Sequence, residues 1–149
     1  MNPADLMVEN NPNPQDLQFL DDQINAYNMA QTGYYDFQWL TLFVRDEAQR
    51  ILAGLAGFTW GKSCRIQTLW VHEALRGQGY GQALLAKAEE EARARGCHVI
   101  VLESHSFQAP AFYQKLGYQV VGVQADYPVG HSQTFLQKRL VAPSESSSL

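Results

Sequence analysis

One stretch of helical periodicity dominates the first third of the chain. Between positions 16 and 30, the apolar side chains recur at helical spacing, at Leu17, Leu20, Ile24 and Tyr27. Asp16 stands just before them, and aspartate is a favoured N-cap, so a helix is predicted to begin there. The preceding segment 5–10 is expected to form a short first strand, because the proline-containing stretch after it interrupts regular structure.

Three segments between residues 37 and 71 favour consecutive strands. Segments 37–46, 51–60 and 64–71 are rich in aromatic and β-branched residues, and apolar and polar positions partly alternate along them. The turns between them are short, so neighbouring strands are expected to pair antiparallel. Gly54 and Gly57 weaken the strand pattern of the second segment without abolishing it.

An amphipathic helix is predicted from about Gly79 to Arg95. Glu89 with Arg93, and Glu91 with Arg95, are spaced four residues apart and are expected to form ion pairs on the solvent-exposed side. The opposite side carries small and aliphatic residues that predict a buried stripe: Leu84, Leu85, Ala88 and Ala92.

A buried strand is predicted directly after this helix. Gly96 ends the helix, and the segment 97–104 is almost entirely apolar in its middle, as in strands that are covered on both faces. A strand, a helix and a second buried strand form a βαβ unit. Strands 64–71 and 97–103 are therefore expected to be parallel neighbours.

The C-terminal part is predicted to contain a short helix and a hairpin. The helix over 109–117 has a proline in its first turn and ends on a glycine. Strands over 118–126 and 132–141 are expected to pair across a wide loop. The residues 142–149 are small and polar and are expected to form a flexible tail, which leaves a single domain over residues 1–141.

Composition narrows the class of protein. The chain has 149 residues, 46% of them hydrophobic and 17% charged, which suits one domain with a packed core. The net charge of −4 gives no general attraction to nucleic acid. The sequence shows neither a signal peptide nor an apolar run of membrane-spanning length, so a cytoplasmic protein is expected. The two cysteines, Cys64 and Cys97, have no metal-binding spacing and are expected to be reduced.

The glycines at the start of the predicted helix point to an anion site. Gly77, Gly79 and Gly81 weaken a helix, but they let an anion approach the unpaired N–H groups of its first turn. Arg76 adds a positive charge beside them. A glycine-rich turn with only a packing role is the alternative at this point.

Two nucleotide-binding patterns are excluded by the same segment. No Gly-Lys-Ser/Thr follows the glycines, so the P-loop pattern is absent. Gln82 occupies the place of the last glycine of the dinucleotide pattern. Residues 72–76 also separate the strand from the glycines, whereas a dinucleotide site places the glycines immediately after the strand.

The order of motifs resembles the GCN5-related N-acetyltransferase (GNAT) superfamily. The pattern R-x-x-G-x-G at Arg76–Gly81 lies about 25 residues before the pattern A-x-x-x-Y-x-x-x-G-Y at Ala109–Tyr118. The resemblance covers residues 5–141, and residues 126–140 are similar to the ending of a group of small bacterial members. It implies an α+β fold with a mixed, mostly antiparallel sheet of about seven strands, a parallel pair formed by the fourth and fifth strands, and about four helices.

The resemblance also implies acetyl-CoA as co-substrate and no metal. In this family the pyrophosphate lies on the helix N-terminus, and the pantetheine arm pairs with the preceding strand. The family often has Asn at the position of Ser106, whose shorter side chain leaves that contact open. The residues that the resemblance assigns to the cofactor are Leu69, Trp70, Val71, Arg76, Gly77, Gln78, Gly79, Tyr80, Gly81, Ser106, Ala109, Phe112 and Tyr113.

Three catalytic roles follow from the same resemblance. The N–H of Val71 is expected to stabilise the tetrahedral oxyanion. Tyr113 matches the family's tyrosine, and its phenol is expected to protonate the departing thiolate. Glu103 is the first choice as general base, with Glu73, His105 and ordered water as alternatives.

The expected reaction is acetyl transfer from acetyl-CoA to a primary amine, by direct attack in a ternary complex. The acceptor is expected to be a small molecule or a peptide. Segments 29–39 and 125–133 are expected to form the walls of the pocket that binds it. Neither nucleic acid nor a membrane is expected as a partner. Many members of the family are homodimers, and a homodimer is an expectation here too. The alternative is a catalytically silent acyl-CoA-binding or regulatory module of the same fold.

Overall fold

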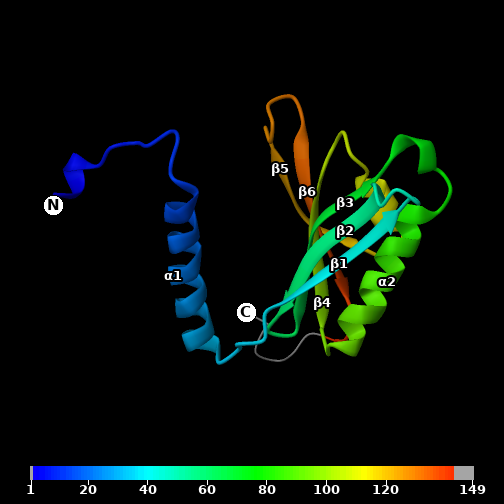
Figure 1. Ribbon diagram of the computed structural model, residues 1–149, viewed down its shortest axis with the longest axis horizontal. Coiled ribbons are helices and arrows are strands. Elements are labelled where there is room, and N and C mark those ends of the chain that lie inside the picture. The colour runs from blue at the N-terminus through cyan, green and yellow to red at the C-terminus, as the bar shows by residue number, and fades with distance from the viewer. Residues whose placement is uncertain (1, 143–149) are drawn as a thin grey trace. The chain divides into compact units, whose positions relative to one another are not determined.

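The structure is a computed structural model and describes residues 2–142. Nearly all of the predicted tail 142–149 therefore lies outside the described residues. The chain forms two compact units that divide between Tyr35 and Asp36, each with its own secondary structure (Figure 1). The single domain over residues 1–141 stays a prediction.

The N-terminal unit contains the predicted helix, α1 (Pro14–Thr32). The helix begins earlier than its apolar periodicity suggests. Asn13, rather than Asp16, is the N-cap, and its Oδ1 accepts the N–H of Gln15 at 2.9 Å. Gly33 ends the helix in a left-handed conformation, with φ of 76°.

The strand expected over residues 5–10 is wrong. The structure has a 3-10 helix, η1 (Pro3–Asp5), followed by irregular chain. Asn2 caps this turn, because its Oδ1 accepts the N–H of Ala4 at 3.0 Å. Proline at the first position of the turn favours its helical conformation. Residues 6–10 pair with no strand in the described part of the chain.

The second unit is built on one mixed sheet that is covered on one face by a long helix (Figure 1). The predicted strands and helices after residue 36 are all present. Their bounds are β1 (Gln38–Arg45), β2 (Ile51–Trp60), β3 (Ser63–Val71), η2 (Glu73–Leu75), α2 (Tyr80–Ala94), β4 (Val99–His105), α3 (Pro110–Lys115), β5 (Gln119–Ala125) and β6 (Ser132–Arg139).

The sheet has the order β1-β2-β3-β4-β6-β5. All of its pairs are antiparallel except β3 with β4, which confirms the predicted βαβ unit. The numbers of strands and helices, however, differ from those expected. The described residues form six strands and three α-helices instead of about seven and four, so the parallel pair is the third and fourth strand. The missing strand is the one expected over residues 5–10.

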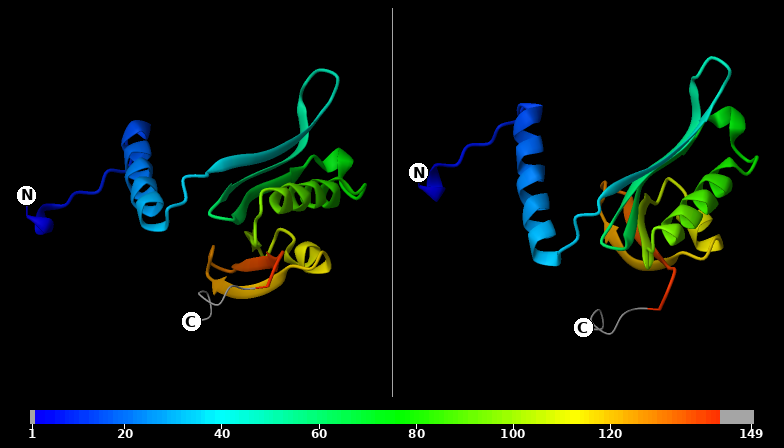
Figure 2. Two further views of the ribbon diagram at one scale, coloured as in Figure 1. Left: turned by 90° about the horizontal axis from the view of Figure 1, so that it is seen from below. Right: turned by 60° about the horizontal axis from the view of Figure 1, so that its bottom comes forward.

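The core lies between α2 and the sheet, and both views of Figure 2 show α2 running alongside the sheet. The predicted stripe of α2 is buried, and Leu85, Ala88 and Ala92 have no exposed surface. They pack with residues of the central strands, such as Leu55 and Ile100. The side chains of α3 pack against the edge of the same core, which places α3 beside the start of α2.

A β-bulge in β3 opens the sheet. Thr68 pairs with Ala56 and Ile66 pairs with Gly57, so Gln67 is an extra residue in β3. Gly57 is required there, because a Cβ atom at this position would lie 2.3 Å from the carbonyl oxygen of Arg65. Beyond the bulge, β3 leaves its parallel partner.

Candidate active site

The cleft of the second unit lies where β3 and β4 separate. Their parallel pairing is limited to Ser63–Arg65 with Val99–Val101, and it ends before the bulge. The divergence leaves a cleft of about 950 Å³, lined by β3, the glycine turn, the start of α2, β4 and α3. Every residue predicted to bind the cofactor lines this cleft except Gln78 and Ser106. Two motifs far apart in sequence thus form opposite walls of one cavity.

The glycine turn presents bare backbone to this cleft. Gly77 has φ of 76° and Gly79 has φ of 89°, a left-handed conformation that side-chain-bearing residues rarely adopt. A Cβ atom at either position would meet nothing within 4 Å, so the space above the turn is open. Gly79 is the N-cap of α2 and supplies no side-chain hydrogen bond to its first turn. The N–H groups there are available to an anion.

Gly81 lies at the contact between α2 and α3. A Cβ atom at this position would lie 3.4 Å from Cζ of Phe112, which is ordinary van der Waals contact. The left-handed conformation and the open space that favour glycine are therefore at Gly77 and Gly79, on which the predicted anion site rests.

Two polar side chains of the glycine turn form hydrogen bonds with the backbone of the residues before it. Arg76 donates a hydrogen bond from Nε to the carbonyl oxygen of Val71 at 3.0 Å. This bond holds its guanidinium at the end of β3, on the wall of the cleft. Gln78 donates from Nε2 to the carbonyl oxygen of Ala74 at 3.1 Å and does not line the cleft. Gln78 thus contributes backbone to the turn, and Arg76 contributes charge.

The backbone N–H of Val71 faces the open side of β3. The N–H of His72 donates to the carbonyl oxygen of Leu52 at 2.8 Å, across the antiparallel pair of β2 and β3. N–H groups alternate in direction along a strand, so that of Val71 points away from β2. Among the described residues, no strand pairs with β3 on that side beyond the bulge. This is the direction in which the predicted oxyanion donor has to point.

Tyr113 lies on α3 at the wall of the same cleft. Its ring packs edge-on against Phe112 and Tyr118, with centroids 5.1 and 5.9 Å away. Burial raises the pKa of the Tyr113 phenol above its ordinary value. The hydroxyl is therefore protonated at neutral pH, as a proton donor to a thiolate has to be.

A second, smaller cavity meets the cleft at the point where the strands separate. It has a volume of about 350 Å³ and is lined mainly by polar side chains, among them Arg65 and Gln133. Ile66, Gln67, Glu103 and Gln108 line both cavities. Arg65, Gln67, Gln108 and Gln133 are cavity residues that no motif in the sequence predicts. The position of the bulge, which turns Gln67 toward the cavities, has no signal in the apolar periodicity.

Glu103 stands at this junction, but both of its carboxylate oxygens are engaged. Oε1 forms an ion pair with Nη2 of Arg65, and Oε2 accepts a hydrogen bond from Nε2 of Gln133 at 3.0 Å. The alternative bases lie elsewhere. Glu73 is exposed on η2 and lines neither cavity, whereas His105 lines the second cavity. Of the side chains predicted as the base, Glu103 and His105 therefore line the second cavity, and ordered water stays a further alternative.

Ser106 is directed to a structural contact instead of the cleft. Its Oγ accepts the N–H of Ser132 at 3.1 Å, and its N–H donates to the carbonyl oxygen of Ser132 at 2.8 Å. These bonds join the end of β4 to β6. The structure therefore gives no support to a contact between Ser106 and the cofactor.

Three further properties bear on the predicted class. Cys64 and Cys97 are both buried and unpaired with each other, as free thiols. Over residues 2–142, no group of three or more His, Cys, Asp or Glu side chains is arranged to hold a metal ion. None of the helices described in this range is long and apolar enough to cross a bilayer.

Known proteins resemble this chain over most of its length. The acetyltransferase (GNAT) family matches residues 11–118. The acetyltransferase Atu2258 of Agrobacterium fabrum is 37% identical over 118 residues, covering 79% of this chain and 86% of that protein. The blasticidin-S acetyltransferase of Streptomyces morookaense is 38% identical over 95 residues, covering 63% of this chain and 70% of that protein. A crystal structure of an acetyltransferase from Bacillus cereus has a TM-score of 0.76 and 36% identity, covering 90% of this chain and 98% of that chain.

The matched region contains both walls of the cleft, from the glycine turn to Tyr113 and Tyr118. It also contains the bulged strand and its parallel partner. These relatives are acetyltransferases, which favours an enzyme over a silent acyl-CoA-binding module. The resemblance drawn from the two motifs is confirmed: the chain belongs to the acetyltransferase (GNAT) family and is an acetyltransferase.

Proposed function

We propose that this enzyme transfers the acetyl group of acetyl-CoA to a primary amine of a small molecule or peptide, by direct attack in a ternary complex. The observation that carries the proposal is the cleft between β3 and β4, which has an open glycine turn at one end and Tyr113 on its wall. A second cavity joins it from the other side. Acetyl-CoA and the amine can therefore be bound at the same time, one in each cavity, as direct attack in a ternary complex requires.

The residues of the cleft suit coenzyme A. The left-handed turn at Gly77 and Gly79 and the uncapped start of α2 offer N–H groups to a diphosphate, and Arg76 adds a positive charge. Within residues 2–142, the edge of β3 from Leu69 to Val71 has no strand partner on the cleft side, so its backbone groups are open to the amide-containing pantetheine arm. Acetyl-CoA would supply the activated thioester, and the residues of the cleft would position it.

The reaction then uses three groups of the chain. The lone pair of the neutral amine forms the new C–N bond, and the carbonyl electrons move to oxygen. The N–H of Val71 donates a hydrogen bond to this oxyanion. When the C–S bond breaks, the electron pair goes to sulfur, and the Tyr113 hydroxyl donates its proton to the thiolate. The amine nitrogen has to lose one proton, for which Glu103 and His105 are the candidates beside the cavities.

The second cavity is the proposed entrance of the acceptor. It is polar, and its one carboxylate, Glu103, is already paired with Arg65. This charge balance favours a polar amine without several positive charges over a polycation, because a polycation would need uncompensated carboxylates. The relative from Streptomyces morookaense is named for blasticidin S, so that compound is a reasonable first probe of a small-molecule acceptor. The homodimer and the cytoplasmic location stay predictions.

A thiol-release assay tests the proposal. Purified protein would be mixed with acetyl-CoA and, in turn, blasticidin S, spermidine, kanamycin, single amino acids and short peptides. We expect saturable thiol release with one class of amine and a product heavier by one acetyl group. Calorimetry with acetyl-CoA is the companion measurement. Absence of binding to acetyl-CoA, or release that never exceeds hydrolysis without amine, would refute the proposal.

A further inference from the structure

His105 ends β4 at the wall of the second cavity. Its Nδ1 lies 3.0 Å from the backbone carbonyl oxygen of Tyr127. A carbonyl oxygen only accepts hydrogen bonds, so Nδ1 carries the proton and donates. In the neutral ring, Nε2 consequently has a free lone pair. One backbone contact therefore determines which nitrogen can accept a proton.

The imidazole ring is held between two aromatic rings. Phe107 stacks with it, with centroids 5.1 Å apart and an interplanar angle of 5°, and Tyr127 also stacks with it, at 5.6 Å and 12°. His131 in turn contacts the Phe107 ring edge-on at 5.1 Å. Because the ring is stacked with two aromatic rings and Nδ1 is engaged, Nε2 is the polar atom of the ring left for a ligand. Within residues 2–142, no hydrogen bond involves Nε2.

Glu103, the other candidate base in this cavity, has no carboxylate oxygen without a hydrogen-bond partner. Both of its oxygens already accept hydrogen bonds, from Arg65 and from Gln133. Receiving a proton would weaken the ion pair with Arg65, whose guanidinium has no other hydrogen-bond partner in the described part of the chain. The two neighbours on β4 therefore differ in kind. Glu103 forms part of a structural polar network, and His105 presents an uncommitted acceptor.

We propose that His105 is the general base of the acetyl transfer. This rests on the function proposed above. As the amine nitrogen bonds to the carbonyl carbon, it becomes positively charged, and Nε2 of His105 takes one of its protons. Tyr113 gives its proton to the departing sulfur, and the proton held by His105 returns to the Tyr113 phenolate through water. The net products are the acetylated amine and coenzyme A, with both side chains restored.

The variant His105→Asn isolates this role. The asparagine amide retains a donor for the Tyr127 carbonyl but has no basic nitrogen. We expect thiol release with the most active amine of the panel to fall by about 100-fold, within the range measured for general bases. The affinity for acetyl-CoA should stay within about twofold, since His105 does not line the cofactor cleft. Added imidazole should restore part of the rate.

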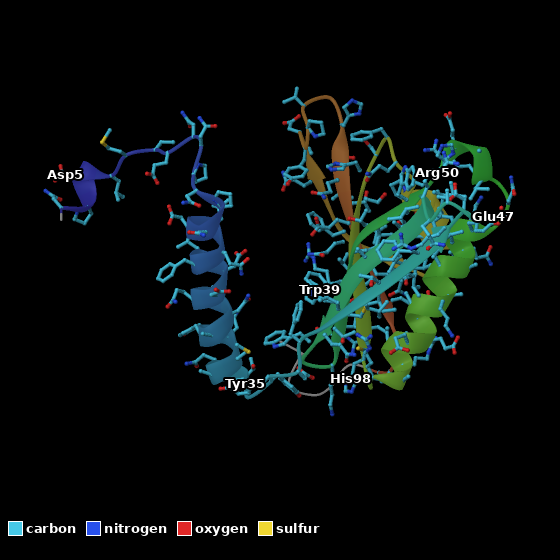
Figure 3. All side chains as sticks on the ribbon, in the orientation of Figure 1. Asp5, Tyr35, Trp39, Glu47, Arg50 and His98 are labelled. Carbon is cyan, nitrogen blue, oxygen red and sulfur yellow. The ribbon has the colours of Figure 1, made fainter. Side chains whose placement is uncertain are left out.

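The matched control is His98→Asn. His98 lies just before the opposite end of β4, is labelled in Figure 3, and lines neither cavity. Its substitution should leave the rate unchanged. If His105→Asn folds poorly, His105→Gln serves instead, with acetyl-CoA binding as the measure of an intact fold.

The outcomes separate this proposal from the one on which it rests. Wild-type protein that turns over an amine while His105→Asn retains at least half of the rate overturns the role of His105 and leaves the proposed function intact. A loss of rate in His105→Asn that is confined to KM, with no rescue by imidazole, also overturns it. Wild-type protein that binds acetyl-CoA but acetylates no amine overturns both.

Discussion

Nζ of Lys138 on β6 donates a hydrogen bond to Oε2 of Glu89 on α2 at 3.0 Å, and both side chains are largely buried. Glu89 Oε1 accepts a second bond from the hydroxyl of Tyr118 at 3.0 Å. Lys138 donates a further bond to the carbonyl oxygen of Leu116 at 2.9 Å, just past the end of α3. This buried network ties together the helix that begins at the glycine turn and the helix that carries Tyr113.

The first prediction concerns this ion pair. Lys138→Met leaves the Glu89 carboxylate buried without its cation and should lower the free energy of unfolding by about 3 kcal/mol. Lys87→Met is the matched control, because Lys87 pairs with Glu90 at 3.2 Å on the exposed side of the same helix. Its effect should be below about 0.5 kcal/mol. Equal losses in urea unfolding of the two variants would contradict the structural role of the buried pair.

The second prediction concerns the anion site. Gly79→Ala and Gly96→Ala place a side chain at positive φ, 89° and 78°, at opposite ends of α2, and neither Cβ meets an atom within 4 Å. Each should cost about 1 kcal/mol of stability. Only Gly79→Ala should weaken acetyl-CoA binding, by about tenfold, because its methyl group occupies the space for the diphosphate. Calorimetry that finds both variants equally weakened would exclude a specific cradle.

The third prediction concerns the bulge. A methyl group at Gly57 would lie 2.3 Å from the carbonyl oxygen of Arg65, so Gly57→Ala forces β3 to move where the cleft begins. The free energy of unfolding should fall by about 2 kcal/mol, and acetyl-CoA affinity should fall with it. Gly122→Ala in β5 is the control, since nothing lies within 4 Å of its Cβ. Thermal unfolding and calorimetry of both variants check this prediction. A Gly57→Ala variant with unchanged stability and unchanged affinity for acetyl-CoA would refute it.

The fourth prediction concerns the proton donor. Tyr113→Phe removes the hydroxyl and retains the ring that packs against Phe112 and Tyr118. Turnover of acetyl-CoA should fall at least about tenfold, because the thiolate leaves without a proton, while acetyl-CoA affinity changes little. Steady-state thiol release and calorimetry measure the two quantities. Unchanged turnover would remove Tyr113 from the mechanism.

The fifth prediction concerns alkaline pH. Burial raises the pKa of Cys64 from 9.0 to about 12. Above pH 9 the unfolded chain loses this proton while the folded chain keeps it. The contribution of this thiol to the free energy of unfolding is therefore fully present below pH 9 and decreases as the pH rises toward 12. The slope should be about 1.4 kcal/mol per pH unit from this thiol. Denaturant unfolding between pH 10 and 11, where the unfolded thiol is ionised and the folded thiol is protonated, measures this slope, and a slope that is the same in Cys64→Ala would contradict the assignment.

The sequence by itself determined what depends on neighbouring residues. The period of apolar positions predicted α2 almost to its ends, and the run from Gly77 to Gly81 predicted an open turn at its start. The alternation and short turns of β1, β2 and β3 predicted the antiparallel meander. These features arise from hydrogen bonds and conformational preferences that act over a few residues, so a local pattern is enough to find them.

The tertiary structure decided which polar groups meet. Glu89 was expected to pair with Arg93 on the exposed side of α2, and this was wrong, because its partners come from β6 and from Tyr118. Lys138 lies 49 residues away along the chain, and no local pattern predicts that contact. The expected pair of Glu91 and Arg95, one helical turn apart, was confirmed at 3.0 Å.

The same distinction runs through the site. Two local motifs predicted the walls of the cleft and Tyr113 on one of them. The bulge at Gln67, the engagement of Glu103 by Arg65 and the hydrogen bond from His105 to Tyr127 needed the folded sheet. A strand's register and the direction of its side chains are set by the strands beside it. Which carboxylate is paired and which nitrogen of the imidazole is engaged is therefore decided by the assembly of the sheet, not by spacing along the chain.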